Sequence, residues 1–286
     1  MAPGGKQRLR FETHARRAAR LVVDPAFAAA AQALELLDPG ALSRHLASAS
    51  GARGRAHTAV LPLGGDLWLH LRPVRHGGLL GPFWGERLLG LGRAVRELEA
   101  TATLRARGAP VPRPVLAVGA RRGALWSAAL GTLHESGTSD GARLLDARPA
   151  AGALRLAIEA AAVALRRFHD AGGRHADLHV GNLLFREQDG GFEVLVIDLD
   201  KARAGAPADP RRRMRELMRL VRSLHKRGAA DVIGARGCAH FLRAYCAGDR
   251  ALRRALLRSL PHERRRLARH ARSWLRRPAV PADPRA

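Results

Sequence analysis

The sequence predicts an α+β fold of two lobes, in which a small antiparallel β lobe with one helix precedes a larger helical lobe that carries a β-hairpin. Short β-rich runs separated by glycine and proline turns fill the chain from about residue 57 to residue 133, with one helical stretch among them. After residue 133 helical periodicity dominates, apart from two short apolar runs. The 286 residues suffice for two lobes with cores of their own.

The first half of the small lobe has two clear local signals. Residues 57–63 and 66–72 flank the pair Gly64-Gly65 and predict a β-hairpin. Residues 93–107 carry apolar side chains at helical spacing, so we expect one amphipathic helix there.

Extended backbone follows this helix. Three prolines in residues 109–114 exclude helix and lead into two strands expected at 115–118 and 124–130. These strands would close the small lobe. Residues 131–133 would then form the hinge, offering backbone groups to an adenine ring.

The larger lobe begins with a long helix and continues with a hairpin. Residues 151–171 read as a helix that ends at Gly172-Gly173, because glycine is the usual residue just past a helix C-terminus. Asn182 to Phe185 and Val194 to Ile197 read as short strands joined by a turn at 188–191. The predicted division of the chain is an N-terminal extension with an Ala-rich helix in 25–37, a small lobe, a large lobe and a tail, at residues 1–40, 41–133, 134–275 and 276–286.

The most informative pattern lies around this hairpin. His175-x-Asp177 follows the long helix, Asn182 comes five residues after Asp177, and Asp198 ends the second apolar run. This order and context are typical of a protein-kinase-like active site. In-line phosphoryl transfer needs a carboxylate to accept the proton of the attacking hydroxyl and two oxygen ligands for Mg²⁺ on the ATP phosphates. Asp177 is the candidate base, and Asn182 and Asp198 are the candidate metal ligands.

The small lobe offers candidates for nucleotide binding. In a kinase fold, a basic residue on a strand contacts the α/β-phosphates and pairs with a carboxylate on the following helix. Arg72 and Glu97 are assigned to these positions, with an exposed helix residue as the alternative for Glu97. A glycine turn at Gly51 and Gly54 could cover the phosphates, and an ordinary loop is as good an interpretation.

The chain is strongly basic, with a net charge of +25 and only three lysines, so nearly all positive charge is arginine. Arginines concentrate at 211–227 and 250–277, and we expect attraction to polyanions, with an anionic membrane surface as the favoured partner. A solvated face produced by coding bias is the alternative. One Tyr and seven Phe provide no stacking platform, so nucleic acid is an unlikely partner.

The cysteines and the hydropathy pattern indicate the cell compartment to expect. Cys238 and Cys246 lie eight residues apart in a helical segment, about 12 Å along its axis, which is too far for a disulfide. They form no metal pattern either, and a reducing cytoplasm is expected. The sequence contains no secretory signal pattern and no stretch of 18 apolar residues. It does not predict an oligomeric state.

With these elements in order, residues 50 to 245 resemble the lipopolysaccharide kinase family, most closely its 3-deoxy-D-manno-octulosonic acid (Kdo) kinases. The motifs that carry the resemblance are Leu71 to Leu79, Arg96-Glu97-Leu98, the proline segment 109–114, His175-x-Asp177, Asn182-Leu-Leu, Asp198-x-Asp200-Lys201 and the basic stretch 219–226. His179 and the pair Pro73-Val74 depart from the family pattern.

The resemblance implies an ATP- and Mg²⁺-dependent kinase at the cytoplasmic face of the inner membrane. Its acceptor would be a sugar hydroxyl, by family precedent the 4-OH of Kdo on a lipid A precursor. Asp177 would be the base, Asn182 and Asp198 the metal ligands, and Arg72 and Glu97 the phosphate-positioning pair. A kinase for heptose or another small molecule, and a catalytically silent kinase-fold scaffold that binds anionic membrane, are the alternatives.

Overall fold

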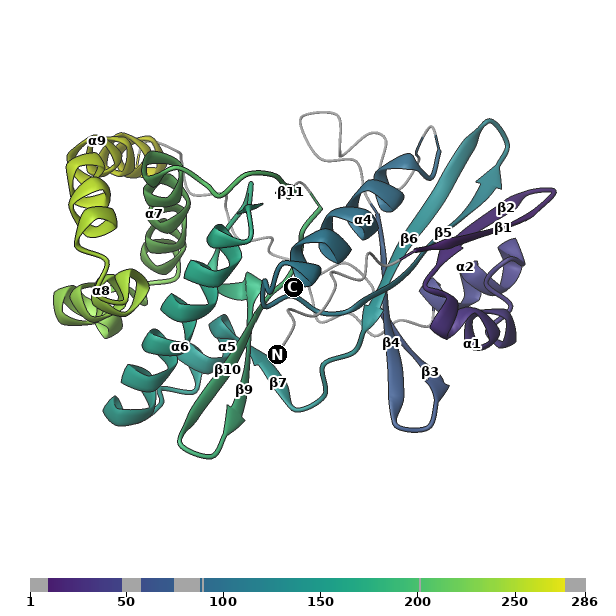
Figure 1. Ribbon diagram of the computed structural model, residues 1–286, viewed down its shortest axis with the longest axis horizontal. Helices are drawn as coiled ribbons and strands as arrows, with labels where there is room; N and C mark the ends of the chain where they lie inside the picture. Colours follow the sequence, from purple (N-terminus) through teal and green to yellow (C-terminus); the bar gives the residue numbers. More distant parts are fainter. Residues whose placement is uncertain (1–9, 48–57, 75–87, 89, 201, 276–286) are drawn as a thin grey trace, which may run out of the picture.

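The computed structural model describes residues 10–47, 58–74, 88, 90–200 and 202–275. Two lobes lie side by side, a β-rich small lobe and a helical large lobe (Figure 1). The chain passes between them after strand β6 (Leu125–Leu133) and enters the large lobe as β7 (Thr138–Asp140). The predicted α+β fold of two lobes is therefore confirmed.

The small lobe is built on a six-stranded antiparallel sheet with the strand order β1-β2-β5-β6-β4-β3. The remaining strands are β1 (Glu12–Arg16), β2 (Ala19–Val23), β3 (Ala59–Gly64), β4 (Leu67–Pro73) and β5 (Pro114–Arg122). The hairpin β3–β4 turns at Gly64 and Gly65, which both have positive φ, as the turn requires. This hairpin and the β5–β6 pair were predicted, and both are confirmed.

Helices cover both faces of this sheet. Helix α4 (Gly92–Ala106) packs Ala94 and Leu98 against Ala117 of β5. The neighbouring residues Leu116 and Val118 belong to the core on the opposite face, because side chains alternate along a strand. The helix predicted at 93–107 is thus fixed between the sheet and the large lobe.

The N-terminal residues contribute more to the small lobe than the sequence indicates. Strands β1 and β2 extend the sheet beside β5, although an extension was expected there. The single helix expected at 25–37 is instead two short pieces, η1 (Pro25–Phe27) and α1 (Ala28–Ala33), and a further helix, α2 (Pro39–Ala47), follows them. Asp24 marks the start of η1 and Asp38 the start of α2, because their side chains accept the backbone N–H groups of Ala26 and Ala41.

The large lobe surrounds helix α6 (Ala151–Asp170). The hairpin β9 (Leu183–Gln188) and β10 (Gly191–Val196) lies against it and forms a three-stranded sheet with β7. Both α6 and the hairpin match the prediction. The other elements are α5 (Gly141–Asp146), β8 (Gly173–Arg174), η2 (Val180–Asn182), β11 (Arg203–Ala204), α7 (Pro210–Lys226), α8 (Ala230–Cys246) and α9 (Arg250–Leu275).

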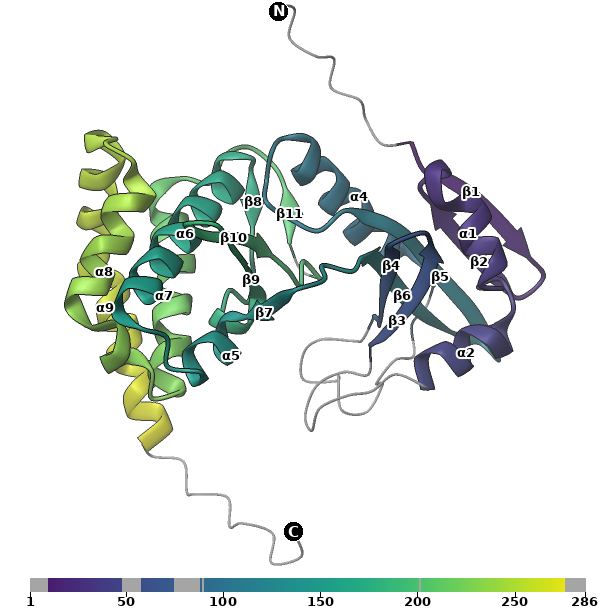
Figure 2. The same cartoon turned by 90° about the horizontal axis from the view of Figure 1, so that it is seen from below.

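Helices α8 and α9 form the side of the large lobe that is remote from the sheet of the small lobe (Figure 2). Cys238 and Cys246 both belong to α8 and are free, in agreement with the helical spacing. None of the described helices combines the length and the apolar character needed to cross a membrane.

Candidate active site

A cavity of about 980 Å³ lies between the two lobes. Strands β4 and β6 and helix α4 line it from the small lobe, and the segment 177–182, Asp198 and helix α7 line it from the large lobe. Five predicted site residues meet in this cavity, namely Arg72, Glu97, Asp177, Asn182 and Asp198. The predicted Gly51 and Gly54 lie outside the described residues, as does the turn at 75–78.

Arg72 and Glu97 form an ion pair across the back of the cavity. The Arg72 guanidinium on β4 donates a hydrogen bond to Oε1 of Glu97 on α4. Only 1% of the Glu97 side chain is exposed, and burial raises the pKa of its carboxyl to about 7 against the opposing charge of Arg72. The second Arg72 contact is Asp198, with its Oδ1 3.6 Å from the guanidinium.

Asp177 follows a tightly held histidine. The His175 ring is buried, with Nε2 3.0 Å from the carbonyl of Ile197 and Nδ1 accepting the backbone N–H of Asp177. Burial lowers the pKa of His175, which favours the neutral ring that these two bonds require. Because one ring contacts both Ile197 and Asp177, it fixes residues 175–182 relative to Asp198. This segment is called the catalytic loop below. The Asp177 side chain itself is exposed to the cavity.

Asn182 and Asp198 are held next to each other by the hairpin. The backbone N–H of Ile197 donates to the Asn182 carbonyl at 3.0 Å, so Asp198 follows directly. The Asn182 side-chain amide donates to the Asp177 carbonyl at 3.0 Å, which leaves its side-chain oxygen available. Asp198 has φ 59°, a left-handed conformation that aspartate tolerates better than most residues, and such strain is frequent at functional sites.

These two residues fit a magnesium ion bound partly by nucleotide phosphates. Mg²⁺ in phosphoryl-transfer sites uses one or two protein oxygens and takes its other ligands from substrate phosphates and water. Within the part of the chain that the structure describes, no three His, Cys, Asp or Glu side chains gather into a self-sufficient metal site. An amide oxygen and one carboxylate open to the cavity agree with that pattern.

Asp200 has a different partner. Its carboxylate forms two hydrogen bonds with Arg93 in the first turn of α4, at 2.8 and 2.5 Å. The Asp200 carboxylate is thus paired with Arg93 of α4. Of the two carboxylates in the Asp-x-Asp motif, Asp198 is the one that faces the cavity.

The predicted hinge at residues 131–133 needs a correction. These residues belong to β6, which lies between β5 and β4, so both sides of its backbone are paired. The Leu133 N–H bonds to the Arg113 carbonyl, and the His134 N–H bonds to the Trp68 carbonyl. The connection between the lobes therefore begins after His134, and the backbone of 131–133 is used by the sheet.

Helix α7 supports the catalytic loop, which the sequence did not indicate. Oε2 of the buried Glu216 accepts the backbone N–H of His175 at 2.9 Å, and Arg219 donates to the His175 carbonyl at 3.0 Å. One turn further, the Ser223 hydroxyl accepts the N–H of Val180 at 3.1 Å. These contacts join segments about 40 residues apart in sequence, so no local pattern could have revealed them.

The basic stretch of α7 is not one uniform surface. Arg213 is buried. Its guanidinium Nη1 lies 2.6 Å from Oδ1 of Asp170 in an ion pair, and its Nε donates a hydrogen bond to the Ala208 carbonyl. Arg219 and Arg222 line the cavity, while Arg211 is exposed. The expectation that the whole run around 211–222 is a solvated or membrane-facing surface is therefore wrong for Arg213 and for the cavity residues.

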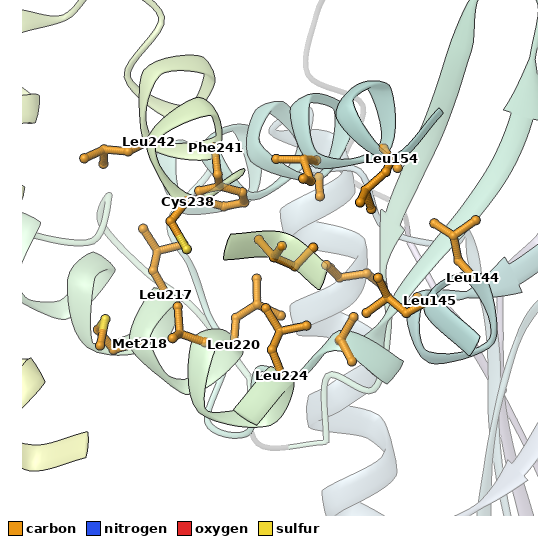
Figure 3. Close-up of a pocket in the computed structure, with 18 of the residues that line it drawn as sticks. Leu144, Leu145, Leu154, Leu217, Met218, Leu220, Leu224, Cys238, Phe241 and Leu242 are labelled. Atoms are coloured by element: carbon orange, nitrogen blue, oxygen red, sulfur yellow. The ribbon is translucent and has the colours of Figure 1, made fainter. Parts of the chain in front are cut away.

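A second cavity, of about 210 Å³, lies inside the large lobe between α5, α6, α7 and α8. Figure 3 shows the side chains that converge on it, among them Leu145, Leu154, Leu217, Leu224 and Phe241, and apart from the Cys238 thiol they carry no polar group. Val180 lines both cavities, so the apolar cavity lies directly behind the catalytic loop.

The fold and the site together define a phosphotransferase of the protein-kinase type, with a strand–helix ion pair above the loop of Asp177 and the hairpin that holds Asn182 and Asp198 side by side. A sequence model of the lipopolysaccharide kinase (Kdo/WaaP) family matches residues 71–245. The chain belongs to this family.

Individual relatives agree with this assignment. The chain is 35% identical over 187 residues to a 3-deoxy-D-manno-octulosonic acid kinase of Stenotrophomonas maltophilia, covering 64% of this chain and 71% of that protein. A kinase of the same name from Vibrio parahaemolyticus is 30% identical over 179 residues, covering 61% of this chain and 71% of the relative. A solved structure of WaaP in complex with acyl carrier protein superposes with a TM-score of 0.56 at 22% identity, covering 89% and 98% of the two chains.

The predicted class of enzyme is confirmed. The chain is a sugar kinase of lipopolysaccharide core biosynthesis, a phosphotransferase that acts on a sugar hydroxyl, and its membership of a kinase family implies the use of ATP.

Proposed function

We propose that this enzyme transfers the γ-phosphoryl group of ATP to the 4-OH of a Kdo residue on a lipid A precursor, with Mg²⁺ as the metal. The observation that carries the proposal is the meeting of Asp177, Asn182, Asp198 and the Arg72–Glu97 pair in one cavity. Relatives named as Kdo kinases, at 30 to 36% identity, support the choice of acceptor.

In the proposed reaction Asp177 accepts the proton of the acceptor hydroxyl. The acceptor oxygen then forms a bond to the γ-phosphorus while the bond from that phosphorus to the β,γ-bridging oxygen breaks, and ADP leaves. The exposed position of the Asp177 carboxylate at the cavity wall supports this role. His175 keeps the loop in place, so that Asp177 needs no rearrangement before it acts.

Arg72 is proposed to bind the α/β-phosphates, and Glu97 to orient it. A guanidinium fixed by a buried carboxylate presents its remaining N–H groups in one direction, which suits phosphate oxygens. Asn182 and Asp198 would hold Mg²⁺. When bound, this ion neutralises charge on the transferring phosphoryl group.

The direct test is a panel of acceptors, namely Kdo-lipid A, a heptosylated core and a soluble aminoglycoside. We expect one added phosphate on Kdo-lipid A by mass spectrometry, dependent on ATP and Mg²⁺ and located at O-4 by fragmentation. Phosphate on the heptose alone would favour the heptose-kinase alternative. Phosphate on the aminoglycoside alone would contradict the proposal that the acceptor is a glycolipid.

We also propose that the enzyme works at the anionic inner face of the inner membrane. Four exposed arginines of α9 support this placement, at spacings that bring them to one side of the helix, namely Arg254, Arg258, Arg265 and Arg269. This surface takes the place of the basic run 211–227 as the candidate membrane contact, because Arg213 is buried and Arg219 and Arg222 line the cavity.

The apolar cavity behind the catalytic loop favours a second ligand. We propose that it receives an acyl chain, as would be delivered by an acyl carrier protein, because its lining is apolar throughout and a solved WaaP structure contains that partner. Leu217→Arg would place a charge in the cavity, with Arg211→Gln as a control elsewhere on α7. Loss of a co-purifying acyl species in native mass spectrometry is expected for Leu217→Arg alone. Absence of any acyl species from the wild type would contradict this proposal.

A further inference from the structure

The cavity between the lobes has a strongly basic wall that the phosphoryl-transfer residues do not use. Helix α7 contributes Arg219, Arg222 and Lys226 to it, Arg227 follows directly after the helix, and α5 contributes Arg143. Arg219, Arg222 and Lys226 follow one another at intervals of three and four residues, so they lie on one face of the helix. Ser223 belongs to the same face and contacts the catalytic loop.

This wall lies on the side of the cavity formed by the large lobe, away from the Arg72–Glu97 pair. Arg219 contacts the carbonyl of His175, two residues before the proposed base Asp177. Arg222 lies beside Ser223, which holds Val180 three residues after Asp177. A group bound to this wall would therefore be part of the acceptor, positioned next to the hydroxyl that Asp177 deprotonates.

The positive charge of the wall is only partly balanced by the protein. Among the described residues, no ion pair involves the Arg222 guanidinium, and the Arg219 guanidinium donates a hydrogen bond to a neutral carbonyl. Burial lowers the pKa of Arg219, and the neighbouring cations Arg222, Arg215 and Arg266 lower it further against the opposing effect of Glu216. A bound anion would offset this repulsion.

We infer that Arg222, together with Arg219, binds the carboxylate of the ulosonic acid residue that is phosphorylated, and so determines acceptor specificity. The inference rests on the proposed function. A Kdo residue carries its carboxylate on the same sugar as the reacting hydroxyl, whereas a heptose has none. A guanidinium fits a carboxylate in a bidentate geometry, which fixes the sugar orientation as well as its position.

The test combines an enzyme variant with an acceptor variant. Wild type, Arg222→Gln and Arg222→Lys are assayed with Kdo-lipid A and with the methyl ester of its Kdo carboxyl. Arg222 is chosen because Arg219 also holds the loop. Arg211→Gln is the matched control, because it also removes one positive charge from this helix but at its exposed start. Isothermal titration with ATP monitors the fold of each variant.

We expect the wild type to prefer the free acid over the ester by about 10- to 100-fold in kcat/KM, the effect of losing a hydrogen bond to a charged group. In Arg222→Gln this ratio should fall toward one, in Arg222→Lys it should be intermediate, and in Arg211→Gln it should match the wild type. If Arg222→Gln lowers kcat/KM equally for the acid and the ester while ATP binding stays normal, the inference is overturned. Arg222 would then bind another anionic group of the lipid.

Failure of the inference differs from failure of the proposed function. If the wild type phosphorylates the acid and the ester equally well, Kdo is the acceptor but its carboxylate is not recognised. If the wild type phosphorylates neither, the proposed acceptor is wrong, and the carboxylate site is overturned with it.

Discussion

Arg93 and Asp200 join the small-lobe helix to the segment of Asp198 through two parallel hydrogen bonds, Nε to Oδ1 at 2.8 Å and a terminal nitrogen to Oδ2 at 2.5 Å. The residues are 107 positions apart in sequence. Four residues after Arg93, Glu97 contacts Arg72, and two residues before Asp200, Asp198 lies within 3.6 Å of the same guanidinium. The pair therefore ties together the two elements that must meet around the nucleotide.

Removal of either partner should loosen this alignment. We expect Arg93→Met or Asp200→Asn to lower kcat/KM for ATP about tenfold, since the pair is bidentate and only 21% and 24% exposed. In a double-mutant cycle the two changes should show a coupling energy of about 1–2 kcal/mol. Strictly additive effects would mean that the pair does not align α4.

Asp198→Ala should weaken nucleotide binding in a metal-dependent manner. With excess Mg²⁺ we expect a loss of affinity for ATP of at least about tenfold, because a metal ligand is gone. With EDTA the variant should bind ATP as tightly as the wild type or more tightly, because a negative charge near Arg72 has been removed. Isothermal titration measures both arms. Unchanged affinity with Mg²⁺ would show that another residue holds the metal.

The buried Glu97 carboxyl predicts a pH dependence near neutrality. Its pKa is raised from 4.5 to about 7, first by burial. Below pH 7 the carboxyl becomes protonated and no longer pairs with Arg72 as an anion, so KM for ATP should rise as the pH falls from 8 to 6. Glu97→Gln should have a high KM without this pH dependence. An identical pH profile for wild type and variant would assign the titration to another group.

The same pKa predicts the opposite trend for stability. Between pH 4.5 and pH 7 the folded state binds the Glu97 proton more tightly than the unfolded state does. Linkage then requires the contribution of Glu97 to the free energy of unfolding to fall as the pH rises through this range. The Tm of the wild type minus the Tm of Glu97→Gln should therefore decrease as the pH rises from 4.5 to 7.

The exposed arginines of α9 should govern binding to anionic vesicles. We expect the fourfold change to Gln at Arg254, Arg258, Arg265 and Arg269 to reduce sedimentation with phosphatidylglycerol vesicles, at about 1 kcal/mol for each side chain near the surface. The effect should disappear in high salt. A matched fourfold control removes exposed small-lobe arginines, Arg16, Arg17, Arg44 and Arg96. Equal losses in both variants would indicate that net charge alone attracts the vesicle.

Local patterns predicted the elements whose signals are complete within a few residues. Gly64-Gly65 predicted the β3–β4 hairpin, and the glycines after α6 predicted where that helix ends. Strand β1 could not be found in this way, because its side chains are largely exposed and show no alternation. Its place in the sheet comes from pairing with β2, which in turn pairs with β5 about a hundred residues later.

The site shows the same division between local and distant contacts. Asp177, Asn182 and Asp198 stand at a spacing that the hairpin geometry dictates, so their positions could be predicted from the sequence. The contact of Glu216 with the His175 backbone depends on how α7 packs against the loop, which no spacing encodes. The hinge was placed too early because the sequence does not show that β6 continues to Leu133 between two partner strands.

The role of Asp177 as the base is the central claim, and Asp177→Asn tests it most directly. The amide keeps the shape of the side chain but cannot accept the hydroxyl proton. Single-turnover transfer from γ-labelled ATP to Kdo-lipid A is measured alongside ATP affinity and Tm. We expect transfer to fall by about 10²- to 10⁴-fold, with ATP affinity and Tm close to those of the wild type. Transfer within a few-fold of the wild-type rate would contradict the account.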